Sequence, residues 1–265
     1  MTNGQDSEKP MPARPLEPHP TAIVIGASTG IGAALVKDLA KRGYHVAALA
    51  RREDKLVELA EKIKSNAAVK TNVIVRAHDV TDYAGIPSLF AELVDQLGGL
   101  DMIIYAAGVM PEVALDEFDF DKDRYQVEIN LMGAMAWLNL AARRFQITKS
   151  GTIVGVGSVA GDRGRQGNPA YNTTKGALAI YLESLRNRLS EHGVQVTTIK
   201  PGFVDTVMLE NVEKTFWVIS PDRAAELIVN AAEKKRQVAY LPFQWRFLML
   251  IIQHIPSFIF RKLGI

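Results

Sequence analysis

The stretch Thr21-Ala-Ile-Val-Ile-Gly26-Ala-Ser-Thr-Gly30-Ile-Gly32 decides the fold. A short β-branched run ends at Gly26, and residues 31–42 follow at once with apolar side chains at helical spacing. A helix that starts directly after a strand leaves unpaired N–H groups and a partial positive charge at its first turn. A pyrophosphate binds there only where no Cβ blocks its approach, which explains glycine at 26 and 30, while Gly32 allows close helix–sheet packing. The stretch predicts a nucleotide site, with a plain tight turn as the alternative.

The same alternation continues along the chain. Strand-like apolar runs lie at 21–26, 44–50, 72–78, 100–106, 151–157 and 193–199, with 237–241 as a further edge strand. Helical patterns lie near 31–42, 53–66, 82–97, 121–147 and 169–191. Continuous apolar strands separated by helices are typical of a parallel sheet that is covered on both faces. We therefore expect one α/β domain over residues 21–242, a doubly wound parallel sheet of the Rossmann type.

Composition excludes several classes of protein. The 265 residues are 48% hydrophobic and 23% charged, as in an ordinary globular chain. A net charge of +2 gives no argument for a nucleic-acid partner, and we expect none. Because the chain has no cysteine, disulfides, thiolate catalysis and Cys-ligated metals are excluded, and we expect no metal site. This usage suits a reducing compartment, so we expect a cytoplasmic protein.

The two ends differ from this domain. Residues 1–20 contain five prolines and few large apolar side chains, so we expect a disordered tail, and the apolar run of a secretory signal is missing. Residues 243–265 form an apolar extension for which we expect helix, interrupted at Pro256. Basic residues flank the apolar run, namely Lys234, Lys235, Arg236, Arg261 and Lys262. Contact of 243–262 with a membrane surface, a dimer contact, a lid on the substrate mouth and a membrane span all remain open.

Arg51 and Arg52 follow the second predicted strand, where a site for NAD usually has an acidic residue that binds the ribose 2′-hydroxyl. Two guanidinium groups at a helix start suit the 2′-phosphate of NADP, although a solvated pair is the alternative. We therefore expect NADP(H) to be preferred over NAD(H). Asp79 ends the third strand, where its carboxylate is expected to accept from the adenine amino group or to cap the next helix.

Tyr171 and Lys175 are four residues apart on a predicted helix, so both side chains lie on one face. A lysine ammonium beside a phenol favours the phenolate and lowers its pKa, which prepares it to exchange a proton with an alcohol or a carbonyl oxygen. Ser158, just past the fifth strand, is placed to donate a hydrogen bond to the same oxygen. A chance Tyr–Lys contact at the surface is the alternative, which Ser158 disfavours.

Over about residues 21–235 the chain resembles the short-chain dehydrogenase/reductase family. The resemblance rests on the glycine stretch, Tyr105-Ala-Ala-Gly108, Asn130, Ser158, Tyr171 with Lys175, and Pro201-Gly-Phe-Val-Asp-Thr206. It implies that Tyr171 is the general acid/base, that Ser158 orients the carbonyl, and that Lys175 binds ribose. Asn130 resembles the residue that holds a water in a proton relay, with a polar group at a helix bend as the alternative. The family usually has Asn where this chain has Tyr105.

The implied catalytic residues are Asn130, Ser158, Tyr171 and Lys175. The residues expected to contact the cofactor follow the strands and are Gly26, Ser28, Thr29, Gly30, Ile31, Gly32, Arg51, Arg52, Asp79, Val80, Ala107, Gly108, Tyr171, Lys175, Pro201, Gly202, Val204 and Thr206.

The expected reaction interconverts a ketone or aldehyde and an alcohol with NADP(H). The apolar segment 203–220 favours a lipophilic substrate. Enoyl reduction, epimerisation and a non-catalytic NADP-binding role are the alternatives. The resemblance also implies a homodimer or homotetramer, for which 121–147 offers a candidate surface that suits the core equally well.

Overall fold

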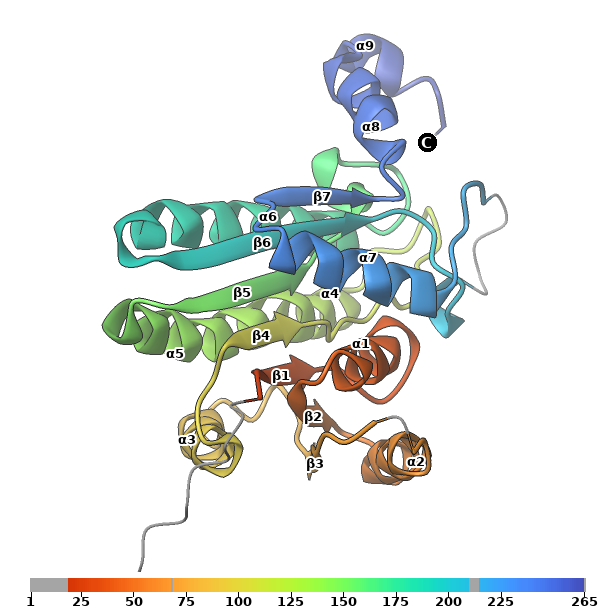
Figure 1. Ribbon diagram of the computed structural model, residues 1–265. Coiled ribbons are helices and arrows are strands. Elements are labelled where there is room, and N and C mark those ends of the chain that lie inside the picture. The colour runs from red at the N-terminus through yellow and green to blue at the C-terminus, as the bar shows by residue number, and fades with distance from the viewer. Residues whose placement is uncertain (1–18, 68, 210–214, 265) are drawn as a thin grey trace, which may run out of the picture.

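A seven-stranded parallel sheet forms the centre of the molecule (Figure 1). The computed structural model describes residues 19–67, 69–209 and 215–264, so most of the expected N-terminal tail lies outside the described residues. The strand order is β3-β2-β1-β4-β5-β6-β7. The strands are β1 Thr21–Ile25, β2 His45–Ala50, β3 Val73–Ala77, β4 Met102–Tyr105, β5 Gly151–Val156, β6 Val194–Pro201 and β7 Val238–Leu241. The chain adds β2 and β3 on one side of β1, and β4 to β7 on its other side, so the sheet is doubly wound. The predicted fold class is confirmed.

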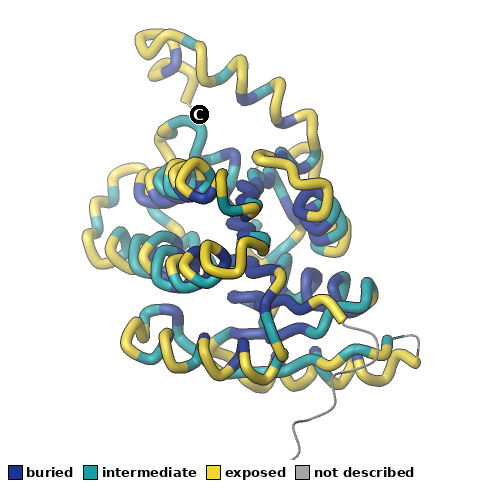
Figure 2. Tube along the Cα trace, turned by 60° about the vertical axis from the view of Figure 1, so that its left-hand side comes forward, coloured by how far each residue is buried: buried dark blue, intermediate teal, exposed yellow. Residues whose placement is uncertain are grey.

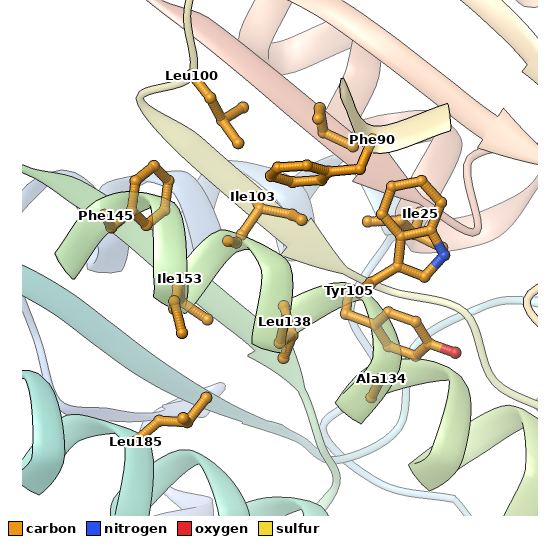
Figure 3. Packing of buried hydrophobic residues seen from close by; sticks show 14 of the residues in the cluster. Ile25, Phe90, Leu100, Ile103, Tyr105, Ala134, Leu138, Phe145, Ile153 and Leu185 are labelled. Atoms are coloured by element: carbon orange, nitrogen blue, oxygen red, sulfur yellow. The ribbon is translucent and has the colours of Figure 1, made fainter. Parts of the chain in front are cut away.

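Helices cover both faces of the sheet. On one face pack α1 Gly30–Lys41, α2 Glu53–Lys64 and α7 Pro221–Glu233. On the other pack α3 Ile86–Leu97, α5 Gly133–Thr148 and α6 Pro169–Leu189, whose apolar side chains meet those of β4 and β5 (Figure 3). The central strands are buried on both faces, which is why they read as unbroken apolar runs.

The predicted helix 121–147 is divided in three. Helix α4 (Phe120–Val127) passes into a π-helical turn at Glu128–Met132 before α5 begins. Two side chains tie this turn to β4 and the segment after it: the Tyr105 hydroxyl donates to the Ile129 carbonyl of the turn, and Asn130 of the turn accepts from the Val109 N–H. Spacing of apolar residues does not show such a turn, because both flanking segments keep a helical period. Within the segment 121–147, which suited a partner surface and the core equally, Ile129 and Trp137 lie in the core, whereas Tyr125 and Met132 are exposed.

Two further segments differ from the predicted elements. Helix α3 begins at Ile86, after a turn that Asp82 closes by accepting from the Gly85 N–H, and so starts later than residue 82. Helix α7 is not among the predicted helices, although the Ser220 side chain caps its N-terminus and Pro221 occupies the first turn.

The C-terminal extension forms α8 (Trp245–His254) and α9 (Ser257–Phe260), which lie beyond the β7 edge of the sheet (Figure 1). The part of the chain that the structure describes contains no helix long and apolar enough to cross a membrane. Because every strand is parallel, the segments that follow β1 to β6 emerge at one edge of the sheet. The carboxyl edge of such a sheet is where ligands bind in doubly wound folds.

Candidate active site

The glycine turn after β1 is shaped by close backbone contacts. Gly26 has φ +91°, and a Cβ there would lie 2.4 Å from the Ala107 backbone nitrogen. A Cβ on Gly32 would lie 2.0 Å from the Gly26 carbonyl oxygen. Gly30 has φ +55°, and its Cβ would come within 3.0 Å of Thr206 Cγ2. Glycine is therefore needed at 26 and 30 because the segments after β4 and β6 press against the turn. The Thr29 side chain makes no capping hydrogen bond at the start of α1, so the first N–H groups of the helix remain for a ligand.

The two arginines after β2 have different partners. Arg52 reaches across to the glycine turn and donates to the Ser28 and Thr29 hydroxyls, each at 3.1 Å. Arg51 points elsewhere, with Nη1 3.9 Å from Asp79 Oδ2. All of these contacts are exposed, so solvent screens them, and the guanidinium groups keep free N–H donors. A concentrated positive charge thus lies at the rim of the glycine turn.

Asp79 is engaged in its own turn. Its Oδ1 accepts from the Thr81 backbone N–H at 3.0 Å and from the Thr81 hydroxyl at 2.8 Å. Burial opposes the charged form, but these two hydrogen bonds and the Arg51 charge prevail, so the pKa of Asp79 is lowered. The carboxylate is therefore ionised at neutral pH and its Oδ2 remains available. Val80, beside it, is buried against the π-helical turn.

Ser158 and Tyr171 come from different elements and meet in the site. Ser158 caps a short 3-10 turn after β5, where its Oγ accepts from the Ala160 N–H at 3.1 Å. Asn168 caps α6 by accepting from the Tyr171 N–H, which fixes this tyrosine in the first helical turn. Burial raises the pKa of the Tyr171 phenol, and the nearby Ser158 hydroxyl acts in the opposite direction. The phenol oxygen also lies 3.8 Å from the Met208 sulfur.

Lys175 lies one turn along α6, and it too is buried. Its Nζ donates to the Val156 carbonyl at 3.1 Å and lies 5.6 Å from the centre of the Tyr171 ring. Burial lowers the pKa of the Lys175 ammonium to about 8. We expected the ammonium to lower the pKa of Tyr171, and the net shift of the phenol is instead upward. Burial disfavours the charged form of both groups. At the phenol, burial raises the pKa by more than the Ser158 hydroxyl lowers it.

Asn130 lies beside Lys175 but is bound to the backbone. Its Oδ1 accepts from the Val109 N–H at 2.7 Å, and its Nδ2 donates to the Val109 carbonyl at 2.9 Å and to Thr174 Oγ1 at 3.2 Å. A Cβ on Gly108 would come within 3.4 Å of both Asn130 Oδ1 and Lys175 Nζ. The carboxamide therefore has the contacts of a polar group at a helix bend, and only the small residue at 108 separates it from the lysine.

The segment after β6 closes the other side of the site. Pro201 and Val204 are buried, and Val204 forms a parallel bridge with Ile219. A 3-10 turn at Val207–Leu209 brings Met208 against the phenol. Within the expected segment 203–220, Met208 thus contacts Tyr171, and residues 210–214 are outside the described residues.

An aromatic cluster joins this segment to the C-terminal extension. Trp245 of α8 stacks on Phe216 with ring centres 5.0 Å apart, and its centre lies 5.5 Å from that of Phe203. Trp217 completes the cluster, 5.6 Å from Trp245. A Cβ on Gly202 would lie 2.0 Å from Trp245 Nε1. From the sequence we assigned Gly202 to the cofactor. In the structure, the absence of a side chain at 202 makes room for the Trp245 indole. Trp245 itself was missed, because its place depends on how α8 returns to the sheet.

Two polar side chains that the sequence did not indicate, Asp162 and Arg163, hold the segment after Ser158. The buried Asp162 carboxylate accepts from Lys200 and from the Tyr240 hydroxyl, the latter at 2.8 Å. Arg163 donates from Nη1 to three carbonyls at the end of α8, those of Ile252, Gln253 and Ile255. The 3-10 turn that begins at Ser158 is thereby tied to β6, β7 and α8.

Comparison with known proteins identifies relatives over most of the chain. The family model for short chain dehydrogenases matches residues 20–216. An uncharacterised oxidoreductase of Mycobacterium tuberculosis strain H37Rv is 29% identical over 242 residues, 91% of this chain and 95% of that protein. An uncharacterised oxidoreductase of Myxococcus xanthus strain DK1622 is 36% identical over 184 residues, 69% of this chain and 72% of that protein.

Solved structures show the same fold. A bulky-bulky ketone specific alcohol dehydrogenase from Comamonas testosteroni superposes with a TM-score of 0.76 at 22% identity and covers 91% of this chain and 96% of its own. A short-chain dehydrogenase from Sphingobium yanoikuyae, solved in complex with NADPH, gives 0.78 at 22% identity and covers 90% and 97%.

Proposed function

This chain belongs to the short-chain dehydrogenase family and is an oxidoreductase of that type, and on this basis we propose that it interconverts a ketone or aldehyde and an alcohol with NADP(H). The observation that carries the proposal is the grouping of the buried Tyr171 phenol with the Ser158 hydroxyl, which acts on its pKa, and with Lys175 one helical turn away. A phenol, a hydroxyl and an ammonium grouped at the carboxyl edge of the sheet form a proton-transfer site.

The residues at this edge fit a dinucleotide. The glycines at 26 and 30 let the segments after β4 and β6 pack against the turn, and we assign a pyrophosphate to the unpaired N–H groups at the start of α1. Ser28, Thr29 and Arg52 surround that turn with donors, and Arg51 adds a second guanidinium group. We assign Ile31, Val80, Ala107, Gly108, Val204 and Thr206 to its walls. When bound, the nicotinamide ring supplies or accepts the hydride.

The arginines support the preference for NADP(H) over NAD(H). A 2′-phosphate is recognised by the planar fork of a guanidinium group, whereas a ribose 2′-hydroxyl needs an acceptor at this position. Asp79 is the nearest carboxylate to Arg51 and already accepts twice from Thr81. Its remaining oxygen is assigned to the adenine amino group. The relative from Sphingobium yanoikuyae was solved with NADPH, in agreement with this preference.

Proton transfer is assigned to the chain's own groups. In the reductive direction Tyr171 donates its phenolic proton to the carbonyl oxygen, and Ser158 donates a hydrogen bond to the same oxygen, which polarises the carbonyl. The raised pKa of Tyr171 keeps the phenol protonated at neutral pH, as this direction requires. Lys175 positions the ribose, and Asn130 holds the 109 backbone beside it.

The substrate that fits this site is lipophilic. Met208 lies against the phenol, and two members of the aromatic cluster, Phe203 and Trp245, pack with Val159, the residue after Ser158. Charged groups are few among these residues, so a bulky apolar ketone is favoured over a sugar phosphate. The named substrate class of the Comamonas testosteroni relative agrees with this assignment.

Replacement of Tyr171 by phenylalanine tests the proposal. NADPH oxidation followed with a panel of lipophilic ketones should fall by a factor of about 10³ or more, because the proton donor is lost, while the Kd for NADPH changes little. Tyr181→Phe is the matched control, since Tyr181 lies on the same helix and donates to Asn139 away from the site. Turnover that survives in Tyr171→Phe removes the phenol from its assigned role.

We also propose a homodimer or homotetramer formed through helix faces. Ile147 on α5 and Ile180 on α6 are exposed large apolar side chains, as are Tyr125 and Met132 near the π-helical turn. Light scattering of the purified protein tests this assignment, and a monomer at all accessible concentrations contradicts it.

A further inference from the structure

Much of the C-terminal extension is exposed (Figure 2), and many of its exposed side chains are large and apolar. We call this exposed apolar surface the outer face. Its members are all between 43% and 65% exposed and are Phe243, Phe247, Leu250, Ile251, Phe258, Ile259 and Leu263. On α8, residues 247, 250 and 251 fall on one side of the helix by their i, i+3, i+4 spacing. A contiguous apolar surface of this kind marks a contact site.

The opposite side of α8 is fixed to the domain. Trp245 and Met249 are buried with Val159, and Arg163 binds three carbonyls at the end of the helix. The Arg163 guanidinium also lies 4.1 Å from the centre of the Phe260 ring of α9. Both helices are therefore held in one orientation. The outer face cannot turn inward without loss of these contacts, so the apolar exposure is built into the fold.

The charge around the outer face has one sign. From 234 to the end of the chain there is no aspartate or glutamate, and the basic residues are Lys234, Lys235, Arg236, Arg246, Arg261 and Lys262. All six are exposed, and within the described ranges none forms an ion pair. Six unpaired cations beside an apolar face are the pattern of a surface that binds anionic lipid.

A hollow of about 710 Å³ opens between α7, β7 and the start of α8, outside the catalytic site. Phe243 and Phe247 line it from the outer face, and Lys234, Arg236 and Arg246 line it with positive charge. Arg223 also lines it and is paired with Glu226. Within the described part of the chain, no carboxylate lines this hollow. Apolar walls with cationic rims suit a phosphate headgroup and the first carbons of its acyl chains.

The outer face could be covered by a lipid surface or by a second copy of the chain, and the charge around it decides between them. In a twofold contact the same surface meets itself, so the six cations of one copy would face the six of the other. A membrane span is unsuited to a helix of ten residues, which extends only about 15 Å. An anionic bilayer accepts both the outer face and the flanking cations. We propose that residues 234–264 dock this protein on an anionic phospholipid surface, with the outer face at the headgroup boundary and lipid phosphate in the hollow.

Co-sedimentation of the full chain with vesicles tests the proposal. We expect binding to phosphatidylcholine vesicles that contain phosphatidylglycerol, and at least about tenfold weaker binding to pure phosphatidylcholine. The triple variant Phe247→Ser, Leu250→Ser, Ile251→Ser should bind about 100-fold more weakly. Its control, Val57→Ser, Leu115→Ser, Phe118→Ser, removes three large apolar side chains from exposed positions outside the outer face and should bind as the parent does.

The charge variant Lys234→Gln, Lys235→Gln, Arg236→Gln should also lose about 100-fold, at roughly fivefold for each cation. Its matched control is Lys64→Gln, Lys70→Gln, Arg188→Gln, which removes the same charge elsewhere on exposed residues. Free inorganic phosphate should not compete below about 10 mM, because it lacks the acyl chains.

Three outcomes overturn the proposal. They are the absence of the parent from anionic vesicles, equal binding of the outer-face variant and its control, and an oligomer that outer-face substitutions dissociate, by light scattering, without any change in vesicle binding. Thermal unfolding of each variant identifies loss of fold as a separate cause. The assay needs neither cofactor nor substrate, so its result is independent of the proposed reaction.

Discussion

The Tyr105 hydroxyl donates a hydrogen bond of 2.5 Å to the Ile129 carbonyl and so ties the end of β4 to the π-helical turn that contains Asn130. Tyr105 is fully buried, and a Cβ on Gly133 would lie 2.5 Å from its hydroxyl. A π-helical turn displaces carbonyls from the usual ladder, and such turns are frequent at functional sites. The chain thus uses tyrosine at a position where the resemblance led us to expect asparagine, and the phenol supports the turn beside the lysine.

Tyr105→Phe should weaken both the fold and the reaction. It leaves the Ile129 carbonyl without this donor in a buried place, which costs about 1–3 kcal/mol of unfolding free energy. Because Asn130 is part of the same turn, we also expect a several-fold fall in kcat with an unchanged Kd for NADPH. Urea unfolding and steady-state kinetics measure the two effects.

Tyr83→Phe is the control for this change. Its hydroxyl donates to the Glu128 carbonyl at 3.3 Å in the same turn, but from an exposed position. We expect a change within about 0.5 kcal/mol and normal turnover. Equal effects of the two substitutions would show that the Tyr105 hydrogen bond contributes no more to stability and turnover than the exposed Tyr83 bond does.

Stability should rise with pH because of Lys175. Below pH 8 its ammonium is charged in the folded and the unfolded chain, so the folded state bears the whole burial penalty. Between about pH 8 and the ordinary lysine pKa of 10.5, the folded chain has lost the proton that the unfolded chain keeps, and the free energy of unfolding rises. Above pH 10 the raised pKa of Tyr171 acts in the opposite direction, since the unfolded phenol ionises first.

Lys175→Met separates this contribution from other titrations. Urea unfolding at pH 7, 8, 9 and 10 should show the parent gaining about 2 kcal/mol relative to the variant across this interval. The methionine keeps the length of the side chain but has no proton to lose. Parallel curves for the two proteins would mean that the lysine is not buried in its charged form.

Much of the fold could be predicted because its signals are local. The strands are apolar runs buried on both faces, and the glycine turn is contiguous, so periodicity and turn chemistry suffice. The division of 121–147 could not be predicted, because it depends on a hydroxyl donated from β4. Helix α7 had a readable start at Ser220-Pro221, and that signal was overlooked.

The candidate site shows the same limit. Tyr171 and Lys175 are spaced by one helical turn, so their shared face follows from the sequence. The direction of the pKa shift of Tyr171 does not, since it depends on how deeply the phenol is buried. Trp245 and Gly202 are more than forty residues apart, and only the return of α8 to the sheet brings them into contact.

Arg52→Gln should reduce the affinity for NADPH and leave that for NADH nearly unchanged. Arg52 is held by two hydroxyls of the glycine turn, so its charge is positioned before the cofactor arrives. Loss of one charge-assisted contact to a phosphate is worth about 1.5–3 kcal/mol, or roughly 10- to 100-fold in Kd. Fluorescence titration with each cofactor measures the ratio.

Arg124→Gln provides the control for this change, since Arg124 is an exposed arginine of α4 that pairs with Asp121. Both affinities should be unaltered in that variant. An equal loss for NADPH and NADH in Arg52→Gln would assign Arg52 to the pyrophosphate rather than to the 2′-phosphate.

Gly202→Ala should couple to Trp245. The new Cβ would lie 2.0 Å from Trp245 Nε1, so the indole must move away from Phe203 and Phe216. Overpacking of this kind costs about 1–3 kcal/mol. In a Trp245→Leu background the obstacle is gone, and Gly202→Ala should cost less than about 0.5 kcal/mol. Urea unfolding of the four proteins gives the coupling free energy.

Because the indole joins the extension to the segment beside Tyr171, KM for a lipophilic ketone should change in Gly202→Ala as well. Additive costs in the two backgrounds would mean that residue 202 acts on the fold independently of the indole.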